Sequence, residues 1–233
     1  MNIHFACYSS QGTAVTQEDT GPELDPRESG SRAYKSRQER RTEIVDATIA
    51  IIAEQGLAAW KTAELARRVG VSEPSIFRHF ANKEAILTAA VERETAAVRE
   101  LVAGYHGEGP AWERAEGLVL EILDYFAATG GGPIVIMTGQ IVRFSPEIRR
   151  DILGTVELVS EKLTELYGAA VSEAGDPPGV DSHVLADLAI AIIRSTGLRW
   201  IISERTFPFR ESARQMLAIV RRSLRSPEGG EPA

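Results

Sequence analysis

Residues 69–80 read VGVSEPSIFRHF, with helix-forming sequence on both sides. Gly70 can adopt the left-handed backbone conformation that ends a helix. Pro74 is tolerated in the first turn of the helix that follows, where its missing N–H costs nothing. Ile76 and Phe80 are four residues apart, so both can face inward. The stretch therefore predicts two short helices separated by a tight turn.

The helix on the N-terminal side is predicted over residues 62–69, because Leu65 and Val69 share one face. Thr62 offers a capping hydroxyl to this helix, and Ser72 offers one to the next. Two short helices joined by three residues match the helix-turn-helix pattern, in which the second helix enters the major groove of DNA and the first braces it on the backbone. The stretch thus predicts a head that reads DNA.

The charge of the chain has to be weighed against that prediction. The whole chain has 26 Lys and Arg against 33 Asp and Glu, a net charge of -7, which disfavours non-specific attraction to nucleic acid. Residues 36–83 reverse the balance, with eight basic residues against six acidic ones. This local surplus fits a DNA-binding head, and an ordinary solvated charged face would have the same composition.

The composition also limits the class of protein. The 233 residues, 43% of them hydrophobic, suffice for one large domain or two modest ones. Arg194 and Arg199 interrupt the longest apolar stretch, so no transmembrane helix is expected. The start lacks the pattern of an export signal, and the single cysteine, Cys7, excludes an intramolecular disulfide. We expect a cytoplasmic protein without a membrane partner.

An enzyme is not expected. The four histidines have no metal-ligand spacing, and the sequence contains neither a nucleophile elbow nor a phosphate-binding loop. The glycines at 130–132 lack the Lys and Ser or Thr that a phosphate loop needs, and they fit a helix stop better. No cofactor and no metal site are predicted.

Apolar residues recur at helical spacing along almost the whole chain, which predicts an all-α protein of about nine helices. Residues 35–83 form the predicted DNA-binding head, and residues 84–225 form a helical body. The ends, residues 1–34 and 226–233, are poor in apolar side chains and are predicted to be disordered tails. Local signals for helix ends are Gly56, Gly70, Asn82, Ser145-Pro146 and Asp181.

The run from IVDATIAIIAEQGL through TAELARRVGVSEPSIFRHFANKEAIL resembles the DNA-binding region of the tetracycline-repressor (TetR) family over about fifty residues. The matching features include Gly70-Val71-Ser72, His79-Phe80 and Lys83-Glu84. The resemblance implies a homodimeric transcriptional regulator, usually a repressor, on a palindromic operator. It also implies that a small ligand in the body changes the separation of the two heads. The alternative is a helix-turn-helix protein that no small ligand controls.

The resemblance also implies that Ser75, Phe77, Arg78, His79 and Lys83 fall on positions that commonly contact DNA, and the sequence departs from the family pattern at two places. Phe77 stands where tyrosine is usual, so a phenolic hydrogen bond to phosphate is lost. Trp60-Lys61 replaces the usual small hydroxyl pair. Thr62 can take over the capping and the phosphate contact, while Lys61 can supply charge instead. Arg78 is the candidate for a bidentate contact to guanine. The candidate DNA-binding residues are Arg37, Lys61, Thr62, Ser72, Ser75, Phe77, Arg78, His79 and Lys83.

A ligand pocket is predicted in the body, between the helices at 110–174 and 181–203. Aromatic residues at these spacings are also the normal filling of a helical bundle, so core packing is the competing interpretation. Arg143 can anchor an acidic ligand, and it can equally pair with Glu147. The candidate lining residues are Trp112, Phe126, Met137, Gln140, Arg143, Phe144 and Trp200.

The last two helices resemble the pair that forms a four-helix dimer interface in the family. The helix from residue 181 is apolar on two faces, so one face can pack on its own subunit and the other on a partner. The alternative is a simple core. The candidate interface residues are Leu185, Leu188, Ile192, Thr196, Met216, Leu217 and Val220.

Overall fold

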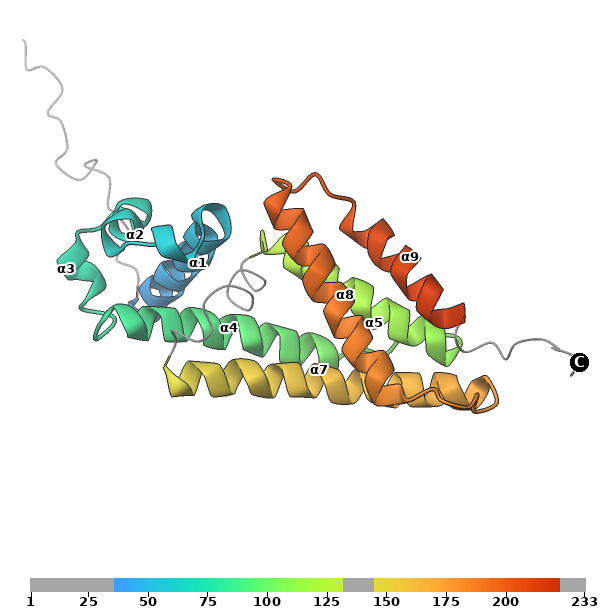
Figure 1. Ribbon diagram of the computed structural model, residues 1–233. Coiled ribbons are helices and arrows are strands. Elements are labelled where there is room, and N and C mark those ends of the chain that lie inside the picture. The colour runs from blue at the N-terminus through green and yellow to red at the C-terminus, as the bar shows by residue number, and fades with distance from the viewer. Residues whose placement is uncertain (1–35, 132–144, 223–233) are drawn as a thin grey trace, which may run out of the picture. The chain divides into compact units, whose positions relative to one another are not determined.

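The computed structural model describes residues 36–131 and 145–222, and every regular element within these ranges is a helix. The all-α prediction is therefore confirmed. One predicted helix, in the apolar stretch before Ser145, and both predicted tails lie outside the described residues. In chain order the helices of Figure 1 are α1 (Arg37–Gln55), a 3-10 turn (Leu57–Ala59), α2 (Thr62–Val69), α3 (Glu73–Ile76), α4 (Lys83–Ala103), α5 (Ala111–Ala128), α7 (Pro146–Glu173), α8 (Ser182–Ile202) and α9 (Phe209–Arg222).

Local hydrogen bonds fix the ends of these helices. Ser36 caps α1 in a capping box, in which its hydroxyl accepts from the Glu39 N–H and the Glu39 carboxylate accepts from the Ser36 N–H. Asn82 caps α4 by accepting from the Ala85 N–H at 2.8 Å. Asp181 caps α8 in the same way. The described ranges contain no helix that is both long and apolar enough to cross a membrane.

The head has its own hydrophobic core. Helices α1, α2 and α3 contribute Ile44, Leu65 and Ile76, all fully buried. Helix α7 adds Ile148 and Ile152 from its first two turns, although these residues are far away in the sequence. The body helix α7 is therefore part of the structure that supports the DNA-reading elements.

The core of the body gathers side chains from α4, α5, α7, α8 and α9. Helix α4 belongs to both cores, because Ile86 and Val91 pack in the head while Val98 and Val102 pack in the body. The head core and the body core therefore share α4, each along a different part of the helix. The boundary predicted at residue 83 therefore separates the reading elements from a helix that completes their core.

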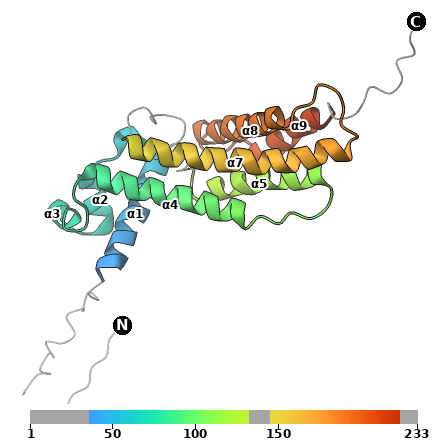
Figure 2. The ribbon, with the colours of Figure 1, turned by 90° about the horizontal axis from the view of Figure 1, so that it is seen from below.

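Polar contacts also tie α4 to its neighbours. Figures 1 and 2 show α4 and α7 side by side, and between them Asp151 accepts hydrogen bonds from Thr95 and Arg99. The Arg99 Nε–H also donates to the Thr155 hydroxyl at 3.0 Å. On the other side, Arg93 forms an ion pair with Asp46 of α1. Helix α4 is thus bonded to the head and to the body.

Candidate DNA-binding surface

The turn between α2 and α3 consists of Gly70, Val71 and Ser72. Gly70 is left-handed, with φ 73° and ψ 35°, and its N–H donates to the last carbonyls of α2. The Val71 N–H donates to the Ala66 carbonyl at 3.0 Å, and the Ser72 carbonyl accepts from the Ser75 N–H at 2.9 Å. One helix closes and the next opens within three residues, which is the geometry of a helix-turn-helix.

Two predicted caps are wrong in detail. Ser72 precedes α3, but its hydroxyl lies 3.0 Å from the Ser75 hydroxyl and makes no capping bond to the backbone. Thr62 is the first residue of α2 and follows Lys61 at the capping position, where no side-chain bond forms. Because Lys61 has no acceptor on its side chain, it cannot cap, and the residue is exposed.

Helix α3 is a single α-helical turn that continues as further turns through His79. Ile76 and Phe80 are buried and anchor it to the head core, as predicted. Phe77, 43% exposed, and the exposed Arg78 lie on the outward side. An exposed aromatic ring beside an exposed guanidinium suits contact with DNA better than contact with water.

Several cations of the head are neutralised by carboxylates. Arg68 donates to both oxygens of Glu54 at 2.8 and 2.6 Å, so it joins α2 to α1. Arg67 forms the same bidentate contact with Glu64 on its own helix. These hydrogen bonds lower the pKa of Glu54 and of Glu64. Arg40 is paired with Glu43 at 2.7 Å.

Two further cations contact aromatic rings. The Arg41 guanidinium lies 4.1 Å from the centroid of the Phe80 ring and donates to the His79 carbonyl. The Lys83 ammonium donates to the Trp60 carbonyl at 3.2 Å and lies 4.7 Å from the centroid of that ring. Trp60 is 1% exposed, so the tryptophan that departs from the family pattern is a core residue of the head.

The remaining three cations of the head are exposed. The side chains of Arg37, Lys61 and Arg78 make no hydrogen bond or ion pair with any residue in the described ranges. They come from the first residue of α1, the approach to α2 and the end of α3. All three were predicted to bind DNA, and the pairing of the other cations singles them out.

The pKa of His79 responds to the positive charges at this edge of the head. Its Nδ1 is buried and has no hydrogen-bond partner among the described residues. Burial lowers the pKa of His79, and the positive charges of Arg37, Arg40, Arg41 and Arg78 lower it further. The arginines of α1 thus act on the same place as the reading segment. Of the basic residues near the start of α1, Arg37 was predicted to bind DNA and Arg41 was not.

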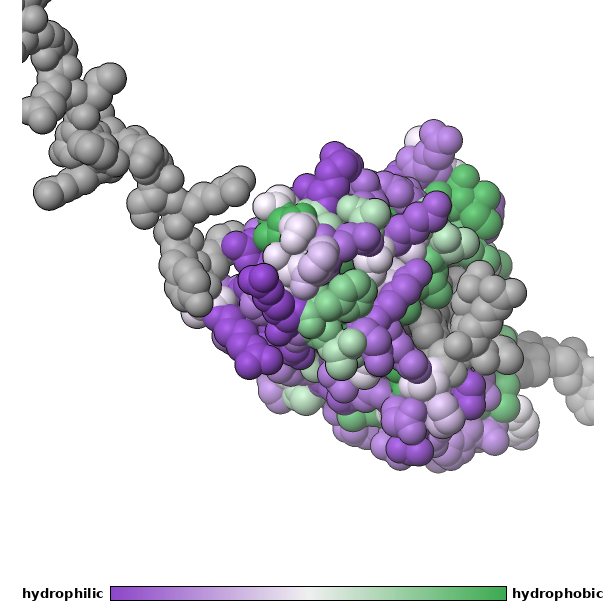
Figure 3. Space-filling model, turned by 90° about the vertical axis from the view of Figure 1, so that its left-hand side faces the viewer, coloured by the Kyte–Doolittle hydropathy of each residue, from purple (hydrophilic) through white to green (hydrophobic). Residues whose placement is uncertain are grey.

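Figure 3 views the molecule from the left-hand side of Figure 1, where the head lies. Hydrophilic side chains dominate this face, with small apolar patches between them. In the turn and the reading segment, Ser72 is exposed, while Ser75 and His79 are partly buried. The head therefore has exposed cations, an exposed serine hydroxyl and the exposed Phe77 ring, which is a composition suited to phosphates and base edges.

Comparison with known proteins shows which family has this helix-turn-helix. Residues 44–90 match the model of the family described as bacterial regulatory proteins, tetR family. The match extends from the middle of α1 through the turn and α3 into α4. The head of this chain is thus a DNA-binding region of the TetR family.

Similar proteins and solved structures match over most of this chain. The nucleoid occlusion factor SlmA of Vibrio vulnificus is 26% identical over 191 residues, which is 81% of this chain and 97% of SlmA. The transcriptional regulator FadR from Bacillus subtilis, in complex with stearoyl-CoA, has a TM-score of 0.63 at 16% identity and covers 78% of this chain and 98% of its own. The TetR-family regulator PfmR from Thermus thermophilus has a TM-score of 0.60 at 22% identity, covering 84% and 100%. The two structures support the fold alone.

The predicted ligand residues that fall in the described ranges are packed in the interior of the body. Trp112 and Phe126 belong to the body core, and Trp112 lies 5.3 Å from Tyr167 between ring centroids. Trp200 is 8% exposed and packs edge to face on Phe209. The other four predicted residues, Met137, Gln140, Arg143 and Phe144, lie outside the described residues.

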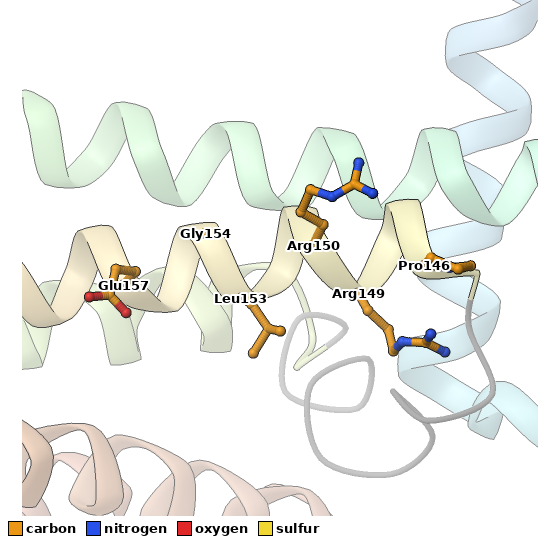
Figure 4. A pocket seen from close by; sticks show the side chains of 6 residues that line it. All are labelled: Pro146, Arg149, Arg150, Leu153, Gly154 and Glu157. Atoms are coloured by element: carbon orange, nitrogen blue, oxygen red, sulfur yellow. The ribbon is translucent and has the colours of Figure 1, made fainter.

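A shallow pocket lies along the N-terminal half of α7 (Figure 4). It is lined by side chains of this one helix, among them Arg149, Arg150, Glu157 and the exposed Leu153. The predicted pocket was expected between several helices of the body, so this surface is not the one that was predicted. In the described ranges no group of three or more His, Cys, Asp or Glu could hold a metal ion.

The predicted dimer residues divide between the core and the surface. Leu185, Ile192, Thr196 and Leu217 are buried in the chain's own core, while Met216 and Val220 are partly buried against that core. Leu188 is 44% exposed. It belongs to an exposed stripe of α8 at alternating spacings of four and three residues, comprising Val184, Leu188, Ala191, Ser195, Leu198 and Ile202.

Proposed function

We propose that this TetR-family regulator is a homodimeric repressor that binds a palindromic operator and is released by a small molecule. The observation that carries the DNA-binding part is the division of charge in the head. Arg37, Lys61 and Arg78 are exposed and unpaired among the described residues, while Arg40, Arg67 and Arg68 are neutralised. Unpaired cations around a reading segment are what phosphate and base contacts require.

The exposed groups of the head match chemical groups on DNA. Arg78 can donate two parallel hydrogen bonds to guanine O6 and N7. Phe77 can pack on a thymine methyl group, which offsets the phenolic contact that the family pattern would supply. Lys61 and Arg37 lie at the beginnings of α2 and α1, where they can hold phosphates on either side of the groove. Because the proposed ligand is chromosomal DNA, the place of action is the cytoplasm.

The exposed stripe of α8 supports the homodimer. Its apolar members, such as Leu188 (44% exposed) and Ile202 (72% exposed), recur at the spacing of a helix seam. Ile219 on the neighbouring α9 is 67% exposed. Large apolar side chains in a row on a regulator's surface indicate contact with another protein. A two-fold partner would bring two copies of the stripe together and would set the spacing of the operator half-sites.

The decisive experiment is fluorescence anisotropy with DNA from upstream of the protein's own gene, across a salt series. We expect binding that weakens with salt, and a loss of about 1 to 3 kcal/mol in Arg78→Ala. Arg67→Ala is the matched control, because Arg67 is exposed but already paired with Glu64. Failure to bind this DNA and a genome-wide fragment library would overturn the proposal, as would equal losses in the two variants.

Control by a small molecule has support of a different kind. FadR from Bacillus subtilis, similar in fold, was solved with stearoyl-CoA, and α4 of this chain joins the head core to the body core. A ligand in such a body could shift α4 and thereby the head.

A DNA-binding protein without small-molecule control is the second candidate, because the SlmA relative is called a nucleoid occlusion factor and matches over 81% of this chain. A compound that raises the melting temperature and also releases DNA favours the first candidate. Binding to many chromosomal sites without such a compound favours the second.

A further inference from the structure

Helix α8 is followed by two charged residues whose backbone is left-handed. Glu204 has φ 53° and Arg205 has φ 67°. The Glu204 N–H donates to the Ile201 carbonyl at 3.1 Å. The Arg205 N–H donates to the Trp200 carbonyl at 2.7 Å, and these two bonds together form a Schellman motif. The first left-handed position of this motif is usually glycine, because a side chain strains the backbone there.

Two other helices end with the same pair of bonds and have the usual glycine. Helix α5 has Gly130 at the first left-handed position, and α7 has Gly175. Left-handed backbone in a residue with a side chain persists where the surrounding contacts fix it, and such residues concentrate at functional positions. After α8, the side chain of Arg205 makes contacts of this kind.

The Arg205 guanidinium lies where the body meets the head. Its Nη2 donates to the Gly130 carbonyl at the end of α5, at 3.2 Å, and its Cζ lies 5.7 Å from the centroid of the Trp200 ring. A Cβ atom at Gly130 would lie 3.4 Å from the Arg205 Nη2 and 3.4 Å from the Cβ of Ala53, in the last turn of α1. The ends of α1, α5 and α8 therefore meet at Gly130.

The charge of Arg205 also acts on the head. Glu54, the residue after Ala53, accepts both hydrogen bonds of Arg68 on α2. The hydrogen bond from Arg68 lowers the pKa of Glu54 most, and the positive charges of Arg68 and Arg205 lower it further. A line of alternating charges thus runs from α2 through the end of α1 to the corner after α8.

We propose that Arg205 is a positioning residue for DNA binding, which holds the end of α1, and with it the reading segment, against the ends of α5 and α8. This inference rests on the proposed dimeric DNA binding and names a residue that orients each head. Helix α8 carries the exposed stripe of the proposed interface, so the contact joins that interface to the head without passing through α4. A chain without Arg205 keeps the head core and the exposed cations but loses one attachment of the head to the body.

Spin labels measure this attachment in the absence of DNA. Cys7→Ser removes the single native thiol. Ala63→Cys on α2 and Glu161→Cys on α7 then place two labels at exposed positions of the head and the body. Labelled chains are mixed with an excess of unlabelled protein, so that double electron–electron resonance reports the distance within one chain. We expect Arg205→Ala to widen the distribution of this distance relative to wild type.

Two further variants separate the contact from a general effect of losing an arginine. Arg199→Ala is the matched control, because Arg199 is an exposed arginine in the last turn of α8 that lies 3.9 Å from the centroid of the Phe207 ring. It should keep the wild-type width. Arg205→Lys retains the positive charge and a donor for the Gly130 carbonyl, so its width should be close to that of the wild type.

Equal widths for Arg205→Ala and the wild type overturn the inference, as does an equal widening in Arg199→Ala. If Arg205→Ala does not fold, as judged by circular dichroism, Glu54→Gln decides, because it removes the charge on the head that Arg205 attracts. An unchanged width in Glu54→Gln then overturns the inference.

DNA anisotropy measures the functional consequence. The probes are a palindrome that the wild type recovers from genomic fragments, its single half-site, and palindromes with a longer or shorter central spacer. Arg205→Ala should bind the half-site as the wild type does and lose about tenfold on the palindrome, because a head that is held less firmly gains less from the second contact. It should also discriminate less between spacers. An equal loss on the half-site and the palindrome overturns the inference.

The two measurements distinguish this inference from the proposed function. If the wild type binds no DNA, the proposed repressor is refuted, and the spin-label widths still decide whether Arg205 attaches the head. If the wild type binds the palindrome and the widths do not change in Arg205→Ala, only this inference is refuted.

Discussion

The Lys83 ammonium donates to the Trp60 carbonyl at 3.2 Å and lies 4.7 Å from the centroid of the Trp60 ring. Trp60 precedes α2 and is 1% exposed, while Lys83 is the first residue of α4. The pair therefore joins the two ends of the reading unit. Lys83 was predicted to hold a phosphate, but its contacts are with its own chain, and this changes what its loss should do.

Lys83→Met keeps the apolar stem and removes the charge. We expect the free energy of unfolding to fall by about 0.5 to 1 kcal/mol, because an exposed cation over an aromatic ring contributes about that much. Lys61→Met, which removes an unpaired cation, should leave stability unchanged and weaken DNA binding more. Urea denaturation and anisotropy measure the two effects. If Lys83→Met weakens DNA binding as much as Lys61→Met and remains fully stable, Lys83 is a phosphate contact.

His79 predicts a pH dependence of stability. Burial and four nearby arginines lower its pKa from the ordinary value of 6.5, so the folded state resists the proton that the unfolded state accepts. The unfolded state then binds more protons between the folded pKa and 6.5, and stability rises with pH across that window. The contribution of His79 is therefore complete above pH 6.5 and is lost as the pH falls through the folded pKa.

Denaturation of the wild type and of His79→Asn from pH 5 to pH 8 (on the order of one step per half unit) checks this expectation. The variant should lose less stability on acidification than the wild type. His106→Asn, at an exposed position in a loop, should keep the wild-type slope. Identical slopes for all three proteins would mean that the arginines do not act on His79 in the folded state.

The fold was predictable where the deciding signals are local. A glycine at 70, an asparagine at 82 and an aspartate at 181 each end or begin a helix through bonds to residues nearby in the chain. The apolar spacing of the helices was equally local. These signals placed the helix-turn-helix and the order of the described helices, and they needed no knowledge of which helices touch.

The site was predictable only in part, because tertiary contacts decide which of its cations are paired and which are unpaired. Arg68 is neutralised by Glu54, which is 14 residues away, and Lys83 is bound to Trp60, which is 23 residues away. No spacing rule separates these cations from Arg78, which is unpaired among the described residues. The shared role of α7 in the head core was missed for the same reason, since Ile152 looks like any apolar residue of a long helix.

The two faces of α8 present the same difficulty and lead to the last prediction. Leu185 and Leu188 are both leucines on an amphipathic helix, but packing against the chain's own core buries the first and leaves the second 44% exposed. If the exposed stripe is the dimer interface, Leu188→Arg should yield a folded monomer, because it places two charges against each other across a two-fold axis. Light scattering at micromolar concentration measures the mass.

The matched control is Leu153→Arg, because Leu153 is 62% exposed but lies on α7, outside the stripe. It should remain dimeric. Leu185→Arg should instead unfold the protein, since it buries a charge in the core of the body. The DNA affinity of the Leu188→Arg monomer should fall on a full palindrome and change little on a single half-site, because only the full site depends on two linked heads. If Leu188→Arg remains dimeric, the exposed stripe of α8 is not the dimer interface.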